Sequence, residues 1–180
     1  APGGAVCAPG RVCVRQHGPM TAQPDTGLSI RLAHPDDLPA VAELRWRWTE
    51  ERGGRPLLTR AEFIPRFVAW AEENRATHRC VVALRNGTVV GMAWLAVMPR
   101  VPQPRSFERA SGDLQSVYVV PSERDRGTGG ALVDAVLTLA RDLGLERVVV
   151  HSSQRAVGVY ARHGFTSDPT LLHVDLRAAT

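Results

Sequence analysis

Apolar and polar residues alternate over residues 28–33 (LSIRLA), a pattern that predicts a half-buried β-strand. The segment that follows, His34-Pro35-Asp36-Asp37, has the proline and the acidic residues that favour the first turn of a helix. A helical apolar stripe comes next and ends near a Gly-Gly pair at 53–54; its members are Leu38, Val41, Leu44 and Trp48. The pattern therefore predicts a strand and then a helix that buries one face.

A second helix and a β-hairpin are predicted in the next fifty residues. Residues 59–62 (TRAE) form a capping box, although Pro65 fits poorly inside a helix and favours a start at Ile64. Two Val-rich runs, 80–84 and 88–97, are joined across an Asn-Gly turn, which is a strong hairpin signal. The sheet is therefore expected to begin with antiparallel strands.

The most informative stretch is Leu114–Leu143, LQSVYVVPSERDRGTGGALVDAVLTLARDL. It predicts a short apolar strand, a turn that begins at proline, a glycine-rich loop and a helix of about four turns. Backbone N–H groups at a helix start lack partners within the helix, and the helix dipole adds positive potential there. Glycines let a ligand approach the main chain closely. This order of elements therefore predicts a site for a phosphate group.

The rest of the chain completes a mixed sheet. Prolines break the chain over 99–112 into a loop that is long enough to overhang a site. An apolar run at 147–151 (RVVVH) lies one helix after the central strand, so we expect a right-handed crossover and a parallel strand pair. A last helix over 154–163 and two short strands, near Phe165 and over 171–176, follow.

Composition is that of one globular domain, which we assign to residues 28–177. Residues 1–27 are rich in glycine and proline without periodicity, and they are interpreted as a disordered arm or a non-native extension. Met20 precedes a plausible native beginning, so the non-native part would be the first nineteen residues. No apolar run is long enough to cross a bilayer. The three cysteines lack the spacing of a metal or redox motif, so we expect no metal and a reducing cytoplasm.

The charge pattern argues against a nucleic-acid partner. The net charge is +4, and all 22 basic residues are arginine, but these are scattered and accompany no nucleic-acid-binding motif. A mildly positive chain instead suits a cofactor that carries several phosphates.

Two motifs resemble the GNAT superfamily of N-acetyltransferases. Residues 124–129 (RDRGTG) match its acetyl-coenzyme A signature (Q/R)-x-x-G-x-(G/A), and residues 153–165 are similar to its motif N-x-x-A-x-x-L-Y-x-x-x-G-F. Ser153 and Val159 depart from that motif, and the side chain of Ser153 has a shorter reach than the usual asparagine. The resemblance covers about residues 28–176. It implies an α/β (mixed α+β) GNAT fold with about six to seven strands and about four helices, whose splayed parallel strand pair holds coenzyme A.

The resemblance also implies a function and a set of site residues. The expected reaction moves an acetyl group from acetyl-coenzyme A to a primary amine, on a small molecule or a protein, by direct attack in a ternary complex. The backbone N–H of Val119, at a bulge, would stabilise the oxyanion, Tyr160 would protonate the departing sulfur, and Asp113 is a candidate general base. The residues expected to bind the cofactor are Val119, Val120, Arg124, Asp125, Arg126, Gly127, Thr128, Gly129, Gly130 and Ser153.

Each of these assignments has a structural alternative. A tyrosine on an apolar helix face is often a core residue, an aspartate at a strand start is often solvated, and loop arginines often face solvent. Glu50, Glu51, Asp36 and the histidines are further candidates for the base; among the histidines, His151 follows a predicted strand at the expected crevice. The alternative function is a GNAT-fold module that binds acyl-coenzyme A without turnover. A homodimer is a further expectation from the family, and no motif identifies the acceptor.

Overall fold

The computed structural model describes residues 27–176. Its elements, in chain order, are β1 (Leu28–Leu32), a 3-10 turn (Pro35–Asp37), α1 (Leu38–Glu51), α2 (Arg60–Glu73), β2 (His78–Arg85), β3 (Thr88–Pro99), β4 (Ala110–Val119), a 3-10 turn (Pro121–Glu123), α3 (Thr128–Asp142), β5 (Val148–Val150) and α4 (Gln154–Arg162). Within this part of the chain, no helix is long and apolar enough to cross a membrane. The disordered arm predicted for residues 1–27 lies, except for Gly27, outside the described residues, as does the last residue of the predicted domain.

The strands form one mixed sheet in the order β1-β2-β3-β4-β5. The first three pairs are antiparallel and the last pair, β4 with β5, is parallel, as the sequence predicted. The hairpin between β2 and β3 turns at Asn86 (φ 50°) and Gly87 (φ 80°), and two positive φ angles are what a type I′ turn requires. The Asn-Gly pair thus fixes the register of the central strands.

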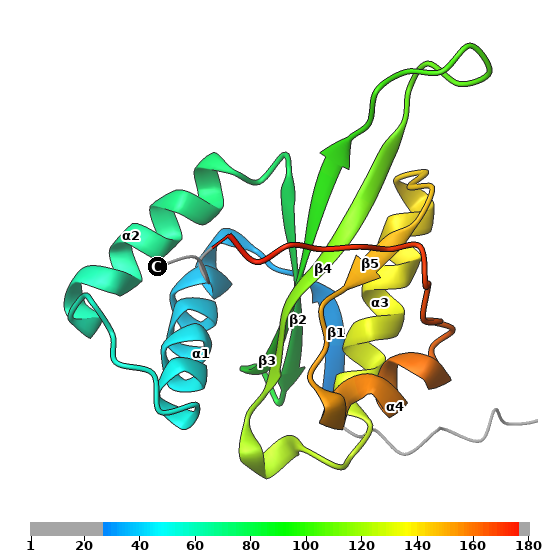
Figure 1. Ribbon diagram of the computed structural model, residues 1–180. Coiled ribbons are helices and arrows are strands. Elements are labelled where there is room, and N and C mark those ends of the chain that lie inside the picture. The colour runs from blue at the N-terminus through cyan, green and yellow to red at the C-terminus, as the bar shows by residue number, and fades with distance from the viewer. Residues whose placement is uncertain (1–26, 177–180) are drawn as a thin grey trace, which may run out of the picture.

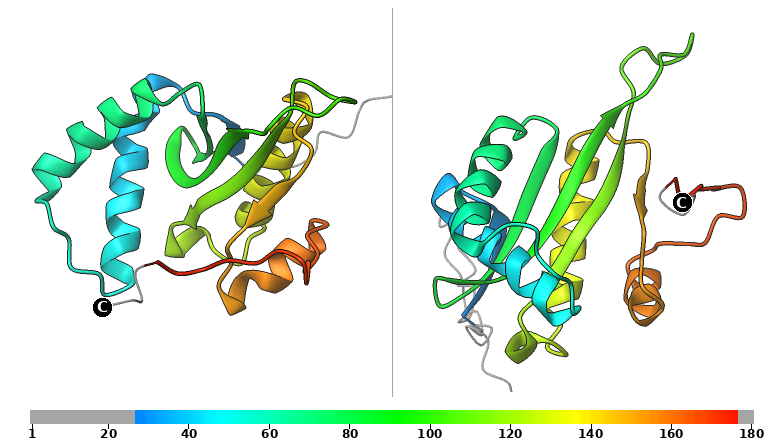
Figure 2. Two further views of the ribbon diagram at one scale, coloured as in Figure 1. Left: turned by 45° about the horizontal axis from the view of Figure 1, so that its top comes forward. Right: turned by 60° about the vertical axis from the view of Figure 1, so that its left-hand side comes forward.

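Helices cover both faces of the sheet. Figures 1 and 2 show α1 and α2 on one face, and α3 with the shorter α4 on the other. Burial of apolar side chains between these layers stabilises the fold, at about 25 cal/mol per Å² of apolar surface. The sheet and the helices on both of its faces contribute fully buried side chains to the core, among them Val41, Met92, Leu95, Leu132 and Val136.

The parallel pair separates soon after it forms. β5 pairs with β4 only over Gly112–Leu114 and Val148–Val150. Farther along β4, the register with β3 shifts between Met92 and Trp94, opposite Ser116, whose φ is 52°. This bulge bends β4 away from β5. The edge of β4 from Ser116 to Val119 therefore faces no neighbouring strand.

The expected strand count is too high, because the sheet has five strands among the described residues. The two short strands predicted near Phe165 and over 171–176 do not form. Asp168 accepts hydrogen bonds from the N–H and the hydroxyl of Thr170, which folds this segment into a local turn. β5, with three residues, offers few groups for a further ladder, and the leucines and the valine of 171–176 stay exposed.

Two local predictions also need correction. α2 begins at Arg60 rather than Ile64, because the Thr59 hydroxyl caps the N–H of Glu62 and the Glu62 carboxylate accepts the N–H of Thr59. Pro65 lies inside α2 on an exposed face, where the Ala61 carbonyl that loses its N–H partner can be hydrated. The proline-rich loop between β3 and β4 overhangs no site; Figure 1 shows it projecting from the end of the sheet opposite the β4–α3 connection.

Candidate active site

A groove lies where β4 and β5 diverge. It is bounded by the second half of β4, the first turns of α3, the exit of β5, one side of α4 and the last turn of α1. Figure 1 shows the carboxyl ends of α1 and β4 at the same end of the molecule. The groove therefore connects the glycine-rich loop on one face of the sheet with α1 on the other.

The glycine-rich loop presents free backbone N–H groups to the groove. Gly127 is the N-cap of α3 with φ 81°, a left-handed conformation that favours glycine, and the first intrahelical bond runs from the N–H of Ala131 to the Gly127 carbonyl. No side chain of the described residues caps this helix. A Cβ on Gly129 would point into open space, with only Val119 as close as 4.0 Å. The cradle thus fits an anionic group such as the pyrophosphate of coenzyme A.

Gly130 has a different role from the glycines before it. An added Cβ there would lie 2.8 Å from Nε2 of His163, the C-cap residue of α4, so the missing side chain makes room for that ring. The other ring nitrogen, Nδ1, lies 2.6 Å from Oδ1 of Asp134 on α3. This contact joins α4 to the first turns of α3 and so holds the two helices that line the groove.

The N–H of Val119 is directed into the groove. The β-bulge, which we expected at Val119, lies at Ser116–Val117. Because the N–H of Val120 donates to the Val90 carbonyl (2.9 Å), the alternation of an antiparallel ladder turns Val119 to the other edge. That edge has no neighbouring strand beyond Leu114. Val119 therefore presents an N–H group as a hydrogen-bond donor inside the groove.

The two loop arginines point in different directions. Nε of Arg124 donates to the Val119 carbonyl (2.9 Å), and its terminal nitrogen binds Glu51 Oε2 at 2.6 Å. Arg126 is 65% exposed and lies 4.0 Å from Glu123. Arg124 thus links β4 to α1 across the groove, while Arg126 faces solvent.

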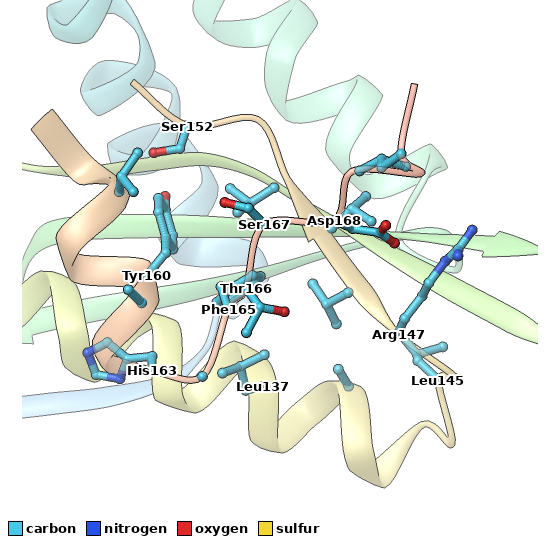
Figure 3. Close-up of a pocket in the computed structure, with 18 of the residues that line it drawn as sticks. Leu137, Leu145, Arg147, Ser152, Tyr160, His163, Phe165, Thr166, Ser167 and Asp168 are labelled. Carbon is cyan, nitrogen blue, oxygen red and sulfur yellow. The ribbon is translucent and has the colours of Figure 1, made fainter. Parts of the chain in front are cut away.

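Tyr160 extends from α4 toward the loop after β5 that carries Ser152 (Figure 3). Its ring packs edge-on against Phe165 at 5.4 Å, and partial burial raises the pKa of its hydroxyl above the usual value. The hydroxyl has no hydrogen-bond partner among the described residues. Tyr160 lies between the groove and a second hollow, shown in Figure 3, which is enclosed by α3, β5, α4 and residues 164–168.

The structure gathers most, but not all, of the predicted site residues. Those that line the groove are Val119, Arg124, Asp125, Gly127, Gly129, Gly130, Ser153 and Tyr160, with His151 beside them. Those that do not line it are Asp113, Val120, Arg126 and Thr128. The N–H of Val120 is taken by β3, and the Thr128 side chain is buried. Ser153 is the N-cap of α4, but its hydroxyl makes no capping bond.

Asp113 lies outside the groove. It pairs in register with Val149 on β5, before the strands separate, and its carboxylate accepts a hydrogen bond from Gln115 Nε2 at 2.7 Å. Its role as a general base therefore stays a prediction that the geometry does not favour.

A polar cluster at the α1 end of the groove was not predicted as a unit. Glu51 accepts a hydrogen bond from the Tyr118 hydroxyl (2.5 Å) as well as from Arg124. The bond from Tyr118, and then Arg124, lower the pKa of Glu51, while burial and the carboxylate raise the pKa of Tyr118 to about 12. In the sequence Glu51 was only one of several base candidates. No sequence pattern signals a contact between residues 67 positions apart.

Known proteins are similar to this chain in sequence and in fold. An amino-acid acetyltransferase of Mycobacterium tuberculosis is 31% identical over 153 residues, which cover 82% of this chain and 74% of that protein. A glucosamine 6-phosphate N-acetyltransferase of Trypanosoma brucei brucei is 31% identical over 90 residues, 50% of this chain and 59% of the relative. The chain thus spans less than two thirds of the trypanosomal relative.

Among solved structures, a Trypanosoma brucei acetyltransferase superposes with a TM-score of 0.64 at 27% identity, covering 83% of this chain and 99% of that one. A "predicted acetyltransferase with acetyl-CoA" from Clostridium acetobutylicum has the same fold, with a TM-score of 0.68 at 17% identity and coverage of 83% and 97%. The family model of the acetyltransferase (GNAT) family matches residues 38–165. The chain belongs to this family, which confirms the predicted mixed α/β fold and the prediction of an acetyltransferase that uses acetyl-coenzyme A.

Proposed function

We propose that this protein transfers the acetyl group of acetyl-coenzyme A to a primary amine by direct attack within a ternary complex. The observation that carries the proposal is the open edge of β4, where the N–H of Val119 faces a groove that Tyr160 also lines. A hydrogen-bond donor to the oxyanion and a proton donor to the leaving sulfur are two groups that accelerate acyl transfer from a thioester.

The free N–H groups after Gly127 support binding of the donor's pyrophosphate. They lie on the α3 side of the groove, so the thioester at the far end of an extended donor reaches β4. In this pose Val119 donates to the thioester oxygen, and this hydrogen bond strengthens as the oxygen becomes negative. The new C–N bond forms while the C–S bond breaks.

Tyr160 then donates its phenolic proton to the departing thiolate. The raised pKa keeps this hydroxyl protonated at neutral pH, so the acid form is the resting form. A thiol pKa of about 8.5 makes the transfer from a phenol moderately uphill. The reaction yields an amide and free coenzyme A, and the phenolate recovers a proton from solvent.

The amine must be unprotonated when it attacks, and no dedicated base is assigned. Glu51, Asp125 and Asp134 are the carboxylates that line the groove. Glu51 has both oxygens occupied and a lowered pKa, so it is a weak base. We propose that the ammonium proton leaves to water in the open groove.

Similarity to other proteins supports an amine acceptor. The trypanosomal relative is named as an N-acetyltransferase and the mycobacterial one as an amino-acid acetyltransferase. The clostridial structure, which has the same fold, was solved with acetyl-coenzyme A. The cytoplasmic location, the homodimer and the lack of a nucleic-acid partner stay predictions from the sequence.

The proposal is tested by release of free thiol from acetyl-coenzyme A in the presence of a broad panel of primary amines. We expect turnover with at least one amine and formation of the matching amide, detected by mass spectrometry. Tight acetyl-coenzyme A binding without turnover across the panel would instead favour the binding module. Absence of binding would contradict the site itself.

A further inference from the structure

Two arginines at the α1 end of the groove flank one aromatic ring. Arg45, Trp48 and Arg52 are spaced i, i+3 and i+7, which places them on one side of the helix. The guanidinium carbon of Arg45 lies 4.6 Å from the ring centroid of Trp48, and that of Arg52 lies 5.6 Å from it. The indole therefore holds two positive charges in a defined position.

These charges have no carboxylate partner in the part of the chain that the structure describes. Among the carboxylates of residues 27–176, none forms an ion pair with Arg45 or Arg52. Glu51, the acidic residue beside Arg52 in the sequence, is occupied by Tyr118 and Arg124. Burial, together with the charge of Arg52, lowers the pKa of Arg45. The cluster thus carries positive charge that no carboxylate within residues 27–176 neutralises by an ion pair.

The cluster belongs to the acceptor half of the groove. Trp48 and Arg52 line the groove together with Val119 and Tyr160. The ring of Trp48 lies 6.1 Å from that of Tyr118, so the two rings form a continuous wall from α1 to β4. The α3 side is the place of the pyrophosphate cradle, and an acceptor therefore approaches from the α1 side.

This positive wall constrains the chemistry of the acceptor. It repels an amine whose only charge is its own ammonium group, because like charges in a partly desolvated groove oppose binding. An acceptor that also carries an anionic group is attracted, since the planar guanidinium matches carboxylate and phosphate oxygens with paired donors. The same positive field favours loss of the ammonium proton and so produces the neutral nucleophile.

We propose that the acceptor is a primary amine that carries a carboxylate or a phosphate, and that Arg52 binds this anionic group. Arg45, which also lies over the Trp48 ring, adds positive charge next to Arg52. The inference rests on the proposed acetyl transfer and specifies its substrate class. It excludes simple polyamines as preferred acceptors.

The test compares matched acceptors that differ in the anionic group alone. The pairs are 3-aminopropionate with 3-aminopropanamide, and phosphoethanolamine with ethanolamine; 1,4-diaminobutane represents the polycations. We expect kcat/KM at least tenfold higher for the anionic member of one pair, and the favoured pair distinguishes carboxylate from phosphate. Equal or higher kcat/KM for the neutral or dicationic amines would overturn the inference and leave acetyl transfer intact.

A variant of Arg52 and a matched control test whether the preference for anionic amines depends on Arg52. Arg52→Gln is expected to reduce the anionic-to-neutral ratio of kcat/KM about tenfold, mainly through KM for the anionic amine. Arg66→Gln removes the same charge from the exposed face of α2, away from the groove, and should preserve the ratio.

Binding can also be measured without turnover. Calorimetric titration of phosphoethanolamine and 3-aminopropionate into the protein with coenzyme A should show about tenfold weaker affinity of Arg52→Gln for the preferred amine. Equal affinity of wild type and variant for both amines would refute the inference whether or not the protein is catalytic, so its failure is distinguishable from failure of acetyl transfer.

Discussion

Replacement of Tyr160 with phenylalanine removes one oxygen and nothing else from the proposed site. Because the hydroxyl has no hydrogen-bond partner among the described residues, the change leaves no polar group unpaired, and the ring contact with Phe165 at 5.4 Å is kept. We therefore expect the free energy of unfolding to change by less than about 0.5 kcal/mol. Acetyl-coenzyme A affinity should change less than about threefold, since the cradle after Gly127 is untouched.

The expected loss in kcat follows from the two pKa values involved. A phenol near pKa 10 that protonates a thiolate of pKa about 8.5 transfers its proton uphill by roughly 2 kcal/mol, and burial of Tyr160 increases this difference. A thiolate is also a tolerable leaving group without help, so the effect should lie at the low end of general acid catalysis. We expect kcat to fall about 100-fold, which corresponds to about 2.7 kcal/mol.

Thiol release under saturating donor and amine measures this change, with thermal melts and donor titrations as controls. The wild type needs the protonated phenol, so its kcat should decrease as pH rises through the raised pKa of Tyr160, above the usual value of about 10. The phenylalanine variant should lack this alkaline decrease. A variant with kcat within about threefold of wild type, at intact donor affinity, would refute the assignment of Tyr160 as the acid.

Three further outcomes are expected. Gly127→Val places a β-branched residue at φ 81° and should weaken acetyl-coenzyme A binding at least tenfold; retained micromolar binding would contradict the cradle. Leu132→Ala empties a fully buried site between α3 and β3 and should destabilise the fold by about 3 kcal/mol in denaturant titration. Glu51→Gln should lower the melting temperature near pH 7, and this difference should shrink as pH falls through the lowered pKa of Glu51, because the ionised carboxylate is lost.

Local patterns predicted the elements that depend on neighbours in sequence. The Asn-Gly turn, the capping box before α2 and the glycines before α3 each act within a few residues, and all three form as predicted. The sequence-based predictions were wrong where the structure of a segment depends on a partner that is distant in the sequence. Residues 171–176 have a strand-like composition, yet a strand requires an adjacent edge, and three-residue β5 provides little of one.

The same division holds inside the site. The sequence by itself determined the glycine-rich loop before α3 and the position of Tyr160 in its motif, because both rest on spacing along one segment. Only the tertiary structure decided that Asp113 lies outside the groove, that Arg124 binds Glu51, and that Arg45 and Arg52 flank Trp48 at the α1 end of the groove. Those contacts depend on how far β4 bends from β5 and where α1 ends against it. Such distances are set by the packing of whole layers, which no local pattern records.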